Sequence, residues 1–394
     1  MLKSNKKANK IYLDYAASAE ANPSSVHSIG LEAKRKLQNS RREVADVLGS
    51  RIEEIIFTSG GTESNNLAIQ GVILAILEEK NFLPHIITTN IEHPSVLKTF
   101  RLLAKRKLAQ ISIVAVELNG IVDPKKIKKE IKKNTVLVSV MYANNEIGTI
   151  QPIGGIAKEI RCYKKITKNI FPLFHTDAVQ AVNYLDINVE KLGVDLLSLS
   201  GSKIEGAGRV GVLYKRKSVK LASIFGGGGQ ELGLRPGTEN LPEIVKFSSA
   251  LKVMQKIKEK ETKRLNTLCG YFLNKLFHSN ILTNYRMIIN GDLQNRLPNI
   301  VNITFPKIPS DLLVIELSAK GIMASSKSAC ESSRAEGSYV IKALRGKIGL
   351  PAEAGAEEGG VRFSMGRKTT KSDLDYTVKA LVEILQKLKK WYNV

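Results

Sequence analysis

From residue 52 to about residue 215, short apolar runs typical of β-strands alternate with segments that have helical periodicity. The runs are apolar along their length rather than at every second position, which is typical of parallel strands buried on both faces. This alternation predicts an α/β fold whose mostly parallel sheet is covered by helices. The expected strands lie in EIIFTSG, HIITTN, ISIVAVEL, TVLVSVMYA, PLFHTD and VDLLSLSG.

Polar residues follow these strands, and their position suggests a ligand site. In a parallel α/β sheet, ligands bind beyond the carboxyl ends of the strands. We therefore expect a site formed by the polar residues that come after them, namely Thr62, His93, Asn145, Asp177, Ser200 and Lys203.

The pattern changes near residue 240, where long helical segments begin. A strand is expected in NIVNITFP, a helix in SDLLVIELSAKG and a strand in GVRFSMGRKTT. We predict a large domain over residues 12–245 and a smaller α+β domain over residues 246–394, joined by residues 1–11. Thr370 and Asp373 resemble a capping box. The last helix has one apolar face: Leu374, Val378, Leu381, Val382, Leu385 and Leu388.

The net charge of +23 raises the question of a nucleic-acid partner. The lysines follow helical patterns such as DPKKIKKEIKKN, in which Asp123 and Pro124 start a helix and Ile127 and Ile131 face its buried side. Aromatic residues do not accompany the basic runs, as a stacking platform would require. We expect no direct nucleic-acid function, although the charge can attract an acidic partner.

Targeting signals and membrane segments are not expected either. The N-terminal MLKSNKKANK is basic but lacks the apolar part of a secretory signal, and no apolar run is long enough to cross a membrane. We therefore expect a cytoplasmic protein that has no membrane partner.

The three cysteines are far apart, so neither a disulfide framework nor a zinc site is expected, and no metal is predicted. Cys269 is expected in a buried helix. Cys330 differs because it lies in SSKSACESSRAEGSYV, a run of small polar residues. A thiol on an apparently exposed loop is unusual, since most free cysteines are buried.

The residues after the strands suggest one cofactor. A lysine that bonds to the cofactor and an aspartate that pairs with its ring nitrogen are the usual protein contributions to pyridoxal 5′-phosphate chemistry, and Lys203 and Asp177 fit these roles. Gly61 and Thr62 begin a helix whose N–H groups suit a phosphate, and the flat ring of His93 could stack on a cofactor. Each feature alone has a structural explanation: a surface lysine, a glycine turn, an aspartate cap. Their combination in one sheet is the stronger signal.

The chain resembles the pyridoxal-phosphate-dependent cysteine desulfurases of the NifS/IscS type, in the class V aminotransferase family. The resemblance implies the fold type I architecture of pyridoxal-phosphate enzymes and covers nearly the whole chain. It rests on stretches that occur in family order: IYLDYAA, NPSSVHSIG, EIIFTSGGTESNNLAI, IITTNIEHPSVL, LVSVMYANNEIGTIQPI, FHTDAVQA, VDLLSLSGSK, GGGQELGLRPGTEN, SKSACESS and VRFSMGR.

The resemblance implies a role for each matching residue. Lys203 matches the lysine that bonds to the cofactor, Asp177 the acid at its ring nitrogen, Gln180 a contact to its ring hydroxyl, and His93 the stacking histidine. Cys330 matches the nucleophile. Phosphate contacts are implied for Gly61, Thr62, Ser200 and Ser202, and, from the neighbouring subunit of a homodimer, for Thr238. Substrate binding or ordering of the site is implied for Asn22, Asn145 and Arg362.

The implied reaction removes sulfur from L-cysteine, which gives L-alanine and a persulfide on Cys330. Acceptors such as an iron–sulfur scaffold or a tRNA-thiolation enzyme would then take the sulfur. Two alternatives remain open: a selenocysteine lyase or other class V enzyme, and a catalytically weak sulfur-relay protein. Cys330 argues against a transaminase, which needs no nucleophilic thiol.

Some residues depart from the family pattern. Ser202 replaces a common histidine, and Glu205 is expected near the phosphate, which is unfavourable unless Arg209 or solvent offsets its charge. Lys327, three residues before Cys330, is a candidate for favouring the thiolate.

Overall fold

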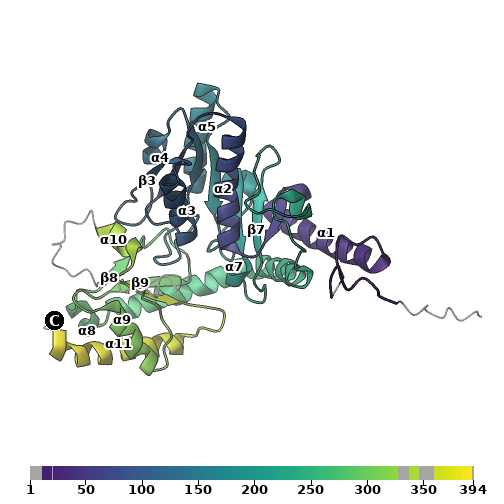
Figure 1. Ribbon diagram of the computed structural model, residues 1–394. Helices are drawn as coiled ribbons and strands as arrows, with labels where there is room; N and C mark the ends of the chain where they lie inside the picture. Colours follow the sequence, from purple (N-terminus) through teal and green to yellow (C-terminus); the bar gives the residue numbers. More distant parts are fainter. Residues whose placement is uncertain (1–10, 20, 327–336, 346–358, 393–394) are drawn as a thin grey trace, which may run out of the picture.

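The computed structural model describes residues 11–19, 21–326, 337–345 and 359–392. Its larger part contains a seven-stranded sheet with the order β1-β7-β6-β5-β4-β2-β3 (Figure 1). The strands are β1 (Ile55–Thr58), β2 (His85–Thr89), β3 (Gln110–Val114), β4 (Thr135–Ser139), β5 (Leu173–Asp177), β6 (Leu196–Ser200) and β7 (Gly211–Lys215). All six strands expected between residues 52 and 201 are present.

Five neighbouring strands, β6, β5, β4, β2 and β3, are parallel, which confirms the mostly parallel sheet. Strand β7 was not predicted, and it pairs antiparallel with both β6 and β1. It follows β6 after a short connection, and a connection this short cannot return the chain for a parallel pairing.

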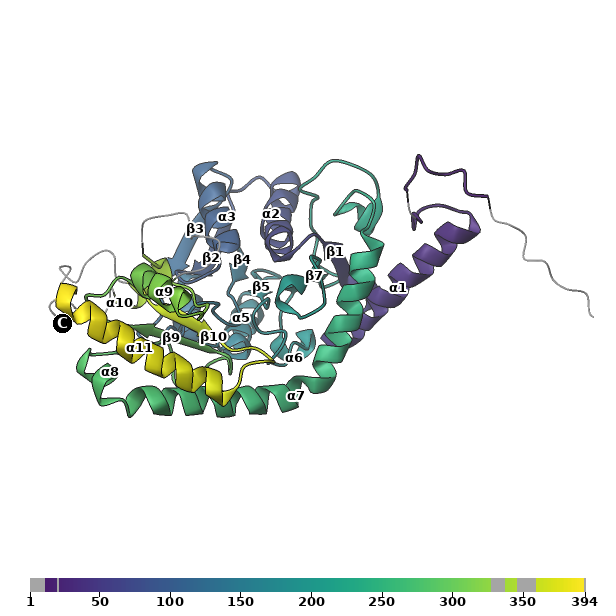
Figure 2. The same ribbon diagram turned by 90° about the horizontal axis from the view of Figure 1, so that it is seen from below.

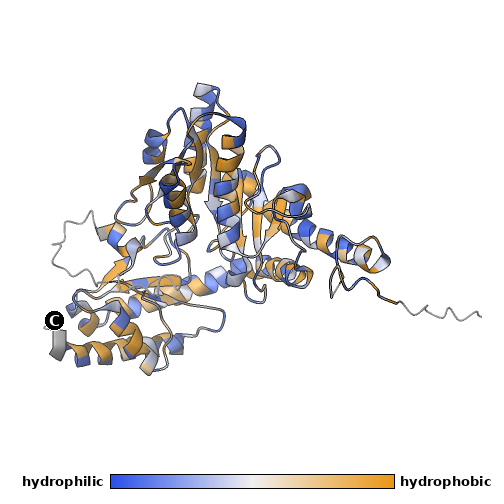
Figure 3. Cartoon of the chain, in the orientation of Figure 1, coloured by the Kyte–Doolittle hydropathy of each residue, from blue (hydrophilic) through white to orange (hydrophobic). Residues whose placement is uncertain are grey.

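Helices cover both faces of this sheet, as predicted. Ile56 of β1 belongs to the core that contains Leu67 and Phe100, whereas its neighbour Phe57 belongs to the core that contains Leu48 and Ile156. Figure 3 shows the strands mostly in orange between helices with blue outer surfaces. The helices are α1 (Ser28–Leu48), α2 (Gly61–Glu79), α3 (Pro94–Lys105), α4 (Pro124–Glu130), α5 (Ile153–Thr167) and α6 (Val189–Leu192), with a short 3₁₀ helix, η1 (Ile52–Glu54).

The C-terminal part forms a smaller domain with a three-stranded antiparallel sheet of order β10-β9-β8. The predicted capping box at its last helix is present, since the Asp373 carboxylate accepts a hydrogen bond from Thr370 N at 2.8 Å and Thr370 Oγ1 accepts one from Asp373 N at 3.2 Å. The elements are α8 (Asn280–Asn284), β8 (Ile288–Asn290), β9 (Ile300–Thr304), α9 (Ser310–Ala319), β10 (Val361–Ser364) and α11 (Lys371–Tyr392).

Helix α7 (Leu241–Phe277) links the two parts and lies beside α1 near one end and α11 near the other (Figure 2). Its first half contributes Phe247 and Leu251 to the core of the large sheet, and its second half contributes Leu268 and Phe272 to the small core. The predicted boundary after residue 245 therefore falls within one continuous helix, and the division itself stays a prediction.

One helix packs in a different core from the elements that precede it in the sequence. Helix α10 (Tyr339–Arg345) follows β9 and α9 of the small domain, yet its Val340, Ile341 and Leu344 are buried in the core of the large sheet. No helix in the described part of the chain is long and apolar enough to span a bilayer.

Two histidines connect strands inside the large sheet. His175 of β5 lies between the hydroxyls of Ser139 and Ser198, at 2.8 Å and 3.0 Å, and His85 of β2 lies 2.8 Å from the Thr135 hydroxyl. Burial lowers the pKa of His175 to about 3 and that of His85 to about 4. Both rings therefore remain neutral at physiological pH.

Acid should weaken the fold through these histidines. A histidine with a lowered folded-state pKa binds more protons after unfolding, so its contribution to stability is complete above pH 6.5 and falls as the pH drops toward about 3 for His175. The slope is at most about 1.4 kcal/mol per pH unit for each histidine. In denaturant titrations between pH 4 and 8, His175→Gln should be less stable at neutral pH but show a flatter dependence. The exposed His278→Gln serves as the control, and an unchanged slope in His175→Gln would contradict the assignment.

Candidate active site

The polar residues that follow the strands meet in one cavity of about 490 Å³ at the carboxyl edge of the large sheet. All six positions expected from the strand ends line it. Of the residues assigned roles from the family resemblance, those that line the cavity are Gly61, Thr62, His93, Asn145, Asp177, Gln180, Ser200, Ser202, Lys203 and Arg362.

Asp177 is the last residue of β5, and the sheet holds it rigidly. Its carbonyl accepts a hydrogen bond from Tyr142 N at 2.8 Å. Its carboxylate accepts bonds from Val179 N at 3.0 Å and from Asn65 Nδ2 at 2.7 Å. The side chain is nearly buried, so its charge is directed into the cavity rather than toward bulk solvent.

His93 caps the start of α3 and is linked to Asp177 through two side chains. Its Nδ1 accepts from Ser95 N at 3.2 Å and lies 2.7 Å from Ser95 Oγ. Because an N–H group can only donate, a neutral His93 carries its proton on Nε2. Asn65 Nδ2 donates to Ser95 Oγ at 2.9 Å as well as to Asp177.

Asn65 was not predicted as a site residue. It is buried in α2, three residues after Thr62, so one helical turn brings it to the cavity. The sequence offered one signal, a pair of asparagines near the start of an otherwise apolar helix. Buried polar side chains require hydrogen-bond partners, so such a pair indicates polar contacts nearby. Ser95, Asn183, Tyr184, Asn299 and Ser364 also line the cavity without having been predicted.

Lys203 ends the short 3₁₀ helix η2 (Gly201–Lys203) directly after β6. Its carbonyl accepts a bond from Asn183 Nδ2 at 2.6 Å, and its side chain extends into the cavity. Ser200 and Ser202 lie on the same turn with their hydroxyl oxygens 3.0 Å apart. The turn thus places one amine and two hydroxyls at one end of the cavity.

The small domain supplies Arg362, which lies on β10. One guanidinium N–H donates to the carbonyl of Asn145 at 2.9 Å, while Arg362 Nε and Asn145 Oδ1 are buried without a hydrogen-bond partner among the described residues. Burial lowers the pKa of Arg362, and nearby Glu146 opposes this shift. A buried cation beside unsatisfied polar atoms favours binding of an anionic ligand group such as a carboxylate.

Glu92, directly before His93, is a fully buried carboxyl. Thr89 Oγ1 donates to it at 2.6 Å and Met141 N at 2.9 Å. Burial raises the pKa of Glu92 to about 8, and these hydrogen bonds oppose the shift without cancelling it. Glu92 is therefore mostly protonated at pH 7, and it joins the loop of His93 to the end of β4.

Several predicted residues lie elsewhere. Asn22 is in the segment before α1, where its side chain bonds to Ala17 O and Ser24 N, and it does not line the cavity. Thr238 lines a different pocket beside the glycine-rich stretch 226–228. Cys330 and Lys327 lie outside the described residues, so their predicted roles are untested.

Glu205, which was expected near the phosphate with Arg209 or solvent to offset its charge, does not line the cavity. Its carboxylate lies 3.3 Å from the Arg367 guanidinium of the small domain, on the exposed surface. The backbone N–H of Arg209 instead donates to Glu243 at 3.3 Å. The charge of Glu205 is thus partly offset by a residue that sequence proximity could not identify.

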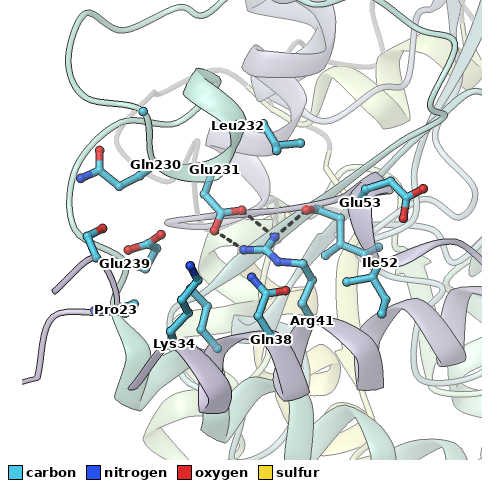
Figure 4. A pocket seen from close by; sticks show the side chains of 14 residues that line it. Pro23, Lys34, Gln38, Arg41, Ile52, Glu53, Gln230, Glu231, Leu232 and Glu239 are labelled. Carbon is cyan, nitrogen blue, oxygen red and sulfur yellow. Dashed lines mark hydrogen bonds and ion pairs between the residues drawn. The ribbon is translucent and has the colours of Figure 1, made fainter. Parts of the chain in front are cut away.

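Another cavity, of about 510 Å³, lies between α1 and the segment around the short 3₁₀ helix η3 (Gln230–Gly233). In Figure 4 the Arg41 guanidinium points at the Glu231 carboxylate, with the two N···O distances at 2.5 Å and 2.8 Å. Glu231 also accepts a bond from Phe57 N at 2.8 Å. The ion pair with Arg41 and the hydrogen bond from Phe57 N therefore attach the segment before Thr238 to α1 and β1.

The family follows from comparison with known proteins. The chain belongs to the class V aminotransferases, whose family model matches residues 5–377. Within it, the chain is 39% identical over 397 residues to the cysteine desulfurase IscS of Dictyoglomus turgidum, covering 96% of this chain and 95% of that protein. It is 41% identical over 380 residues to the cysteine desulfurase IscS of Methanosarcina thermophila, covering 96% and 88%. A solved NifS-like protein superposes with a TM-score of 0.81 at 34% identity, covering 93% of this chain and 92% of that chain.

Enzymes of this family depend on pyridoxal 5′-phosphate, and the cavity fits this group. Gly61 begins α2 without a side chain, and a Cβ there would lie only 2.9 Å from Val179 Cγ2 and 3.2 Å from Ser200 Cβ. Glycine thus lets the positive end of a helix approach the Ser200 hydroxyl, which suits a phosphate. The Lys203 amine and the Asp177 carboxylate supply the other expected donors.

A side chain at position 61 should disturb this approach. Gly61→Ala should lower the free energy of unfolding by about 1–3 kcal/mol, the usual cost of overpacking, and weaken retention of pyridoxal phosphate. Because the nearest atom belongs to Val179, adding Val179→Ala should restore part of the stability. Chemical denaturation and cofactor titration measure both effects. Gly60→Ala is the matched control, since a Cβ there meets no atom within 4 Å. Equal losses of stability and of cofactor retention at both positions would contradict the role assigned to Gly61.

Proposed function

We propose that this protein is a cysteine desulfurase that converts L-cysteine to L-alanine and leaves a persulfide on Cys330. The observation that carries the proposal is the single cavity that combines Lys203, Asp177, His93 and Arg362 in a chain similar to cysteine desulfurases over nearly its full length. Cys330, which lies among small polar residues in the sequence, would supply the nucleophile that this chemistry requires.

The cofactor would be held by groups on both sides of the cavity. The start of α2, with Gly61 and Thr62, and the hydroxyls of Ser200 and Ser202 would bind its phosphate. Asp177 would keep the ring nitrogen protonated, His93 would stack on the ring, and Gln180 would contact the ring hydroxyl. When bound, pyridoxal phosphate supplies an electron sink for the electron pair released at the substrate.

The chain's own residues carry the remaining work. Arg362 and Asn145 bind the substrate carboxylate, because a buried guanidinium recognises carboxylates strongly. The Lys203 amine would hold the cofactor, and together with Nε2 of His93 it would move protons at the substrate. The Cys330 thiolate attacks the substrate sulfur, so that an S–S bond forms while the C–S bond breaks. The carbon retains the electron pair and takes up a proton, which yields alanine.

Sulfur transfer onward completes the proposal. The persulfide would pass to acceptors such as an iron–sulfur scaffold or a tRNA-thiolation enzyme in the cytoplasm. We further infer that residues 246–394, with residues 1–11, act as the small domain that carries Cys330 and Arg362.

The proposal is tested with two substitutions. Purified protein should absorb as a pyridoxal-phosphate enzyme and release sulfide and alanine from cysteine in the presence of a reductant. Lys203→Ala should lose the cofactor's colour. Cys330→Ser should retain the colour and lose sulfide release by roughly a hundredfold or more, because the nucleophile is gone.

Cys162→Ser is the matched control, because Cys162 is exposed on α5 and does not line the cavity. Its sulfide release should equal that of the unaltered protein. Full sulfide release from Cys330→Ser would rule out the assigned nucleophile.

We also infer that the enzyme is a homodimer. Apolar side chains of the N-terminal segment and of the loop near Thr238 are exposed in the single chain: Leu13 is 89% exposed, Val26 89% and Leu232 67%. Such exposure favours burial against another chain. Thr238, which does not line its own chain's cavity, would reach the phosphate of the neighbouring subunit, and Asn22 would be positioned by the same assembly.

Mixed dimers test this arrangement. A Lys203→Ala chain and a Thr238→Asp chain, each with its own affinity tag, should both be defective as homodimers, because one lacks the amine and the other repels the phosphate. If Thr238 serves the neighbouring subunit, their heterodimer contains one intact site and should recover cofactor absorbance and sulfide release at about half the normal value. Failure of the heterodimer to recover would show that Thr238 acts within its own chain, and a fully active Thr238→Asp homodimer would show that Thr238 does not contact the phosphate.

A further inference from the structure

Asn65 contacts the Asp177 carboxylate from the side of helix α2. Its amide Nδ2 donates to Asp177 Oδ2 at 2.7 Å, and Val179 N donates to the other oxygen, Asp177 Oδ1, at 3.0 Å. Both Asn65 and Asp177 are buried, at 1% and 5% exposure. Each carboxylate oxygen therefore receives a hydrogen bond from the protein, and such bonds favour the charged form of a carboxyl group.

The orientation of the Asn65 amide follows from its partners. A carboxylate only accepts hydrogen bonds, so the nitrogen of the amide, and not its oxygen, has to face Asp177. The same nitrogen donates to Ser95 Oγ of α3 at 2.9 Å, which uses its second N–H group. The amide is thus held at two points, with one of its donors directed at Asp177.

This orientation has a cost in stability. Asn65 Oδ1 is buried without a hydrogen-bond partner among the described residues, and burial of an unpaired polar atom is unfavourable. A side chain that only joined α2 to α3 is not needed here, because Thr99 Oγ1 of α3 already donates to Asn66 Oδ1 of α2 at 2.9 Å. The contact with Asp177 therefore explains Asn65 better than the packing of the two helices does.

Other titratable groups surround Asp177. Burial raises the pKa of Glu92 to about 8, and the charge of Asp177 adds to this shift, so Glu92 is mostly protonated at pH 7. The remaining titratable side chains that line the cavity are His93, Tyr184, Lys203 and Arg362. Because the neighbouring carboxyl is neutral, Asp177 is the carboxyl that carries the negative charge at this end of the sheet.

We propose that Asn65 is a positioning residue that keeps the proton shared by Asp177 and pyridoxal phosphate on the ring nitrogen of the cofactor. The inference rests on the proposed function for the place of Asp177 at that nitrogen, and it adds what determines the position of the proton. A carboxylate that accepts a hydrogen bond from Asn65 binds a proton less readily, so the proton stays on the ring. The protonated ring is the stronger electron sink.

Nuclear magnetic resonance of the holoenzyme tests this without using the enzymatic reaction. The protein is loaded with pyridoxal phosphate isotopically labelled at its ring nitrogen, whose resonance differs between the protonated and the unprotonated form. Asn65→Leu has a similar size but no side-chain N–H group. In this variant the ratio of protonated to unprotonated ring nitrogen should fall about tenfold, the effect of losing one hydrogen bond to a charged group. Asn65→Ala, which requires no additional space, should shift the resonance in the same direction.

Thr99→Val is the matched control. The Thr99 hydroxyl donates to Asn66 Oδ1 at 2.9 Å and to the Ser95 carbonyl at 2.7 Å, and its printed partners within the described chain do not include Asp177. This substitution should lower stability and leave the ring-nitrogen resonance unchanged. Asp177→Asn is the reference for complete loss of the charge, and its resonance should be that of an unprotonated ring.

The outcomes separate this inference from the proposed function. A resonance in Asn65→Leu and Asn65→Ala that equals that of the unaltered protein overturns the inference, and so does an equal shift in Thr99→Val. If Asp177→Asn also leaves the resonance unchanged, the assignment of Asp177 to the ring nitrogen fails as well. Absence of sulfide release from a protein in which Asn65→Leu shifts the resonance as expected would refute the proposed function alone.

Discussion

The candidate active site depends on hydrogen bonds that continue between the chain segments beyond the ends of the parallel strands. Tyr142 N, beyond the end of β4, donates to the carbonyl of Asp177 at the end of β5 at 2.8 Å, and Ala178 N, just after β5, donates to the carbonyl of Ser198 within β6 at 3.0 Å. These bonds extend the order of the sheet past its regular strands. Three loops that would otherwise be independent are thereby fixed relative to one another, so the side chains of Asn145, Asp177 and Lys203 converge.

Buried polar groups then refine this arrangement. Asn65 joins Asp177 to Ser95 and so to His93, which couples three elements through one amide group. Because a buried polar atom is costly when unpaired, such a network has few alternative arrangements. The unpaired atoms of Asn145 and Arg362 belong to residues that line the same cavity.

The two parts of the molecule contribute unequally but are not independent. The large sheet supplies the amine, the acid and the helix N-terminus, while the small domain supplies Arg362. Helix α7 contributes to both cores, and α10 returns to the large core from within the small domain's stretch of sequence. In the sequence, the predicted nucleophile thus lies between residues that pack in the small core and residues that pack in the large core.

Local pattern accounted for much of the fold. Continuous apolar runs predicted six of the seven strands of the large sheet, and the apolar face and capping box of the last helix are present, since these features depend on neighbours within a few residues. The strand ends also identified His93, Asp177 and Lys203 as cavity residues. Strand β7 was missed although its sequence GVLYK is also largely apolar, and its antiparallel direction follows from its short connection to β6.

The sequence by itself determined which elements form and which chemical groups end the strands, because hydrophobic periodicity and capping act over short distances along the chain. Only the tertiary structure decided the rest. It placed Asn65 against Asp177, Arg367 against Glu205 and α10 in the core of the large sheet. These contacts join residues about 100 or more positions apart, or elements separated by whole domains, and they are selected by packing and by the pairing of buried polar groups.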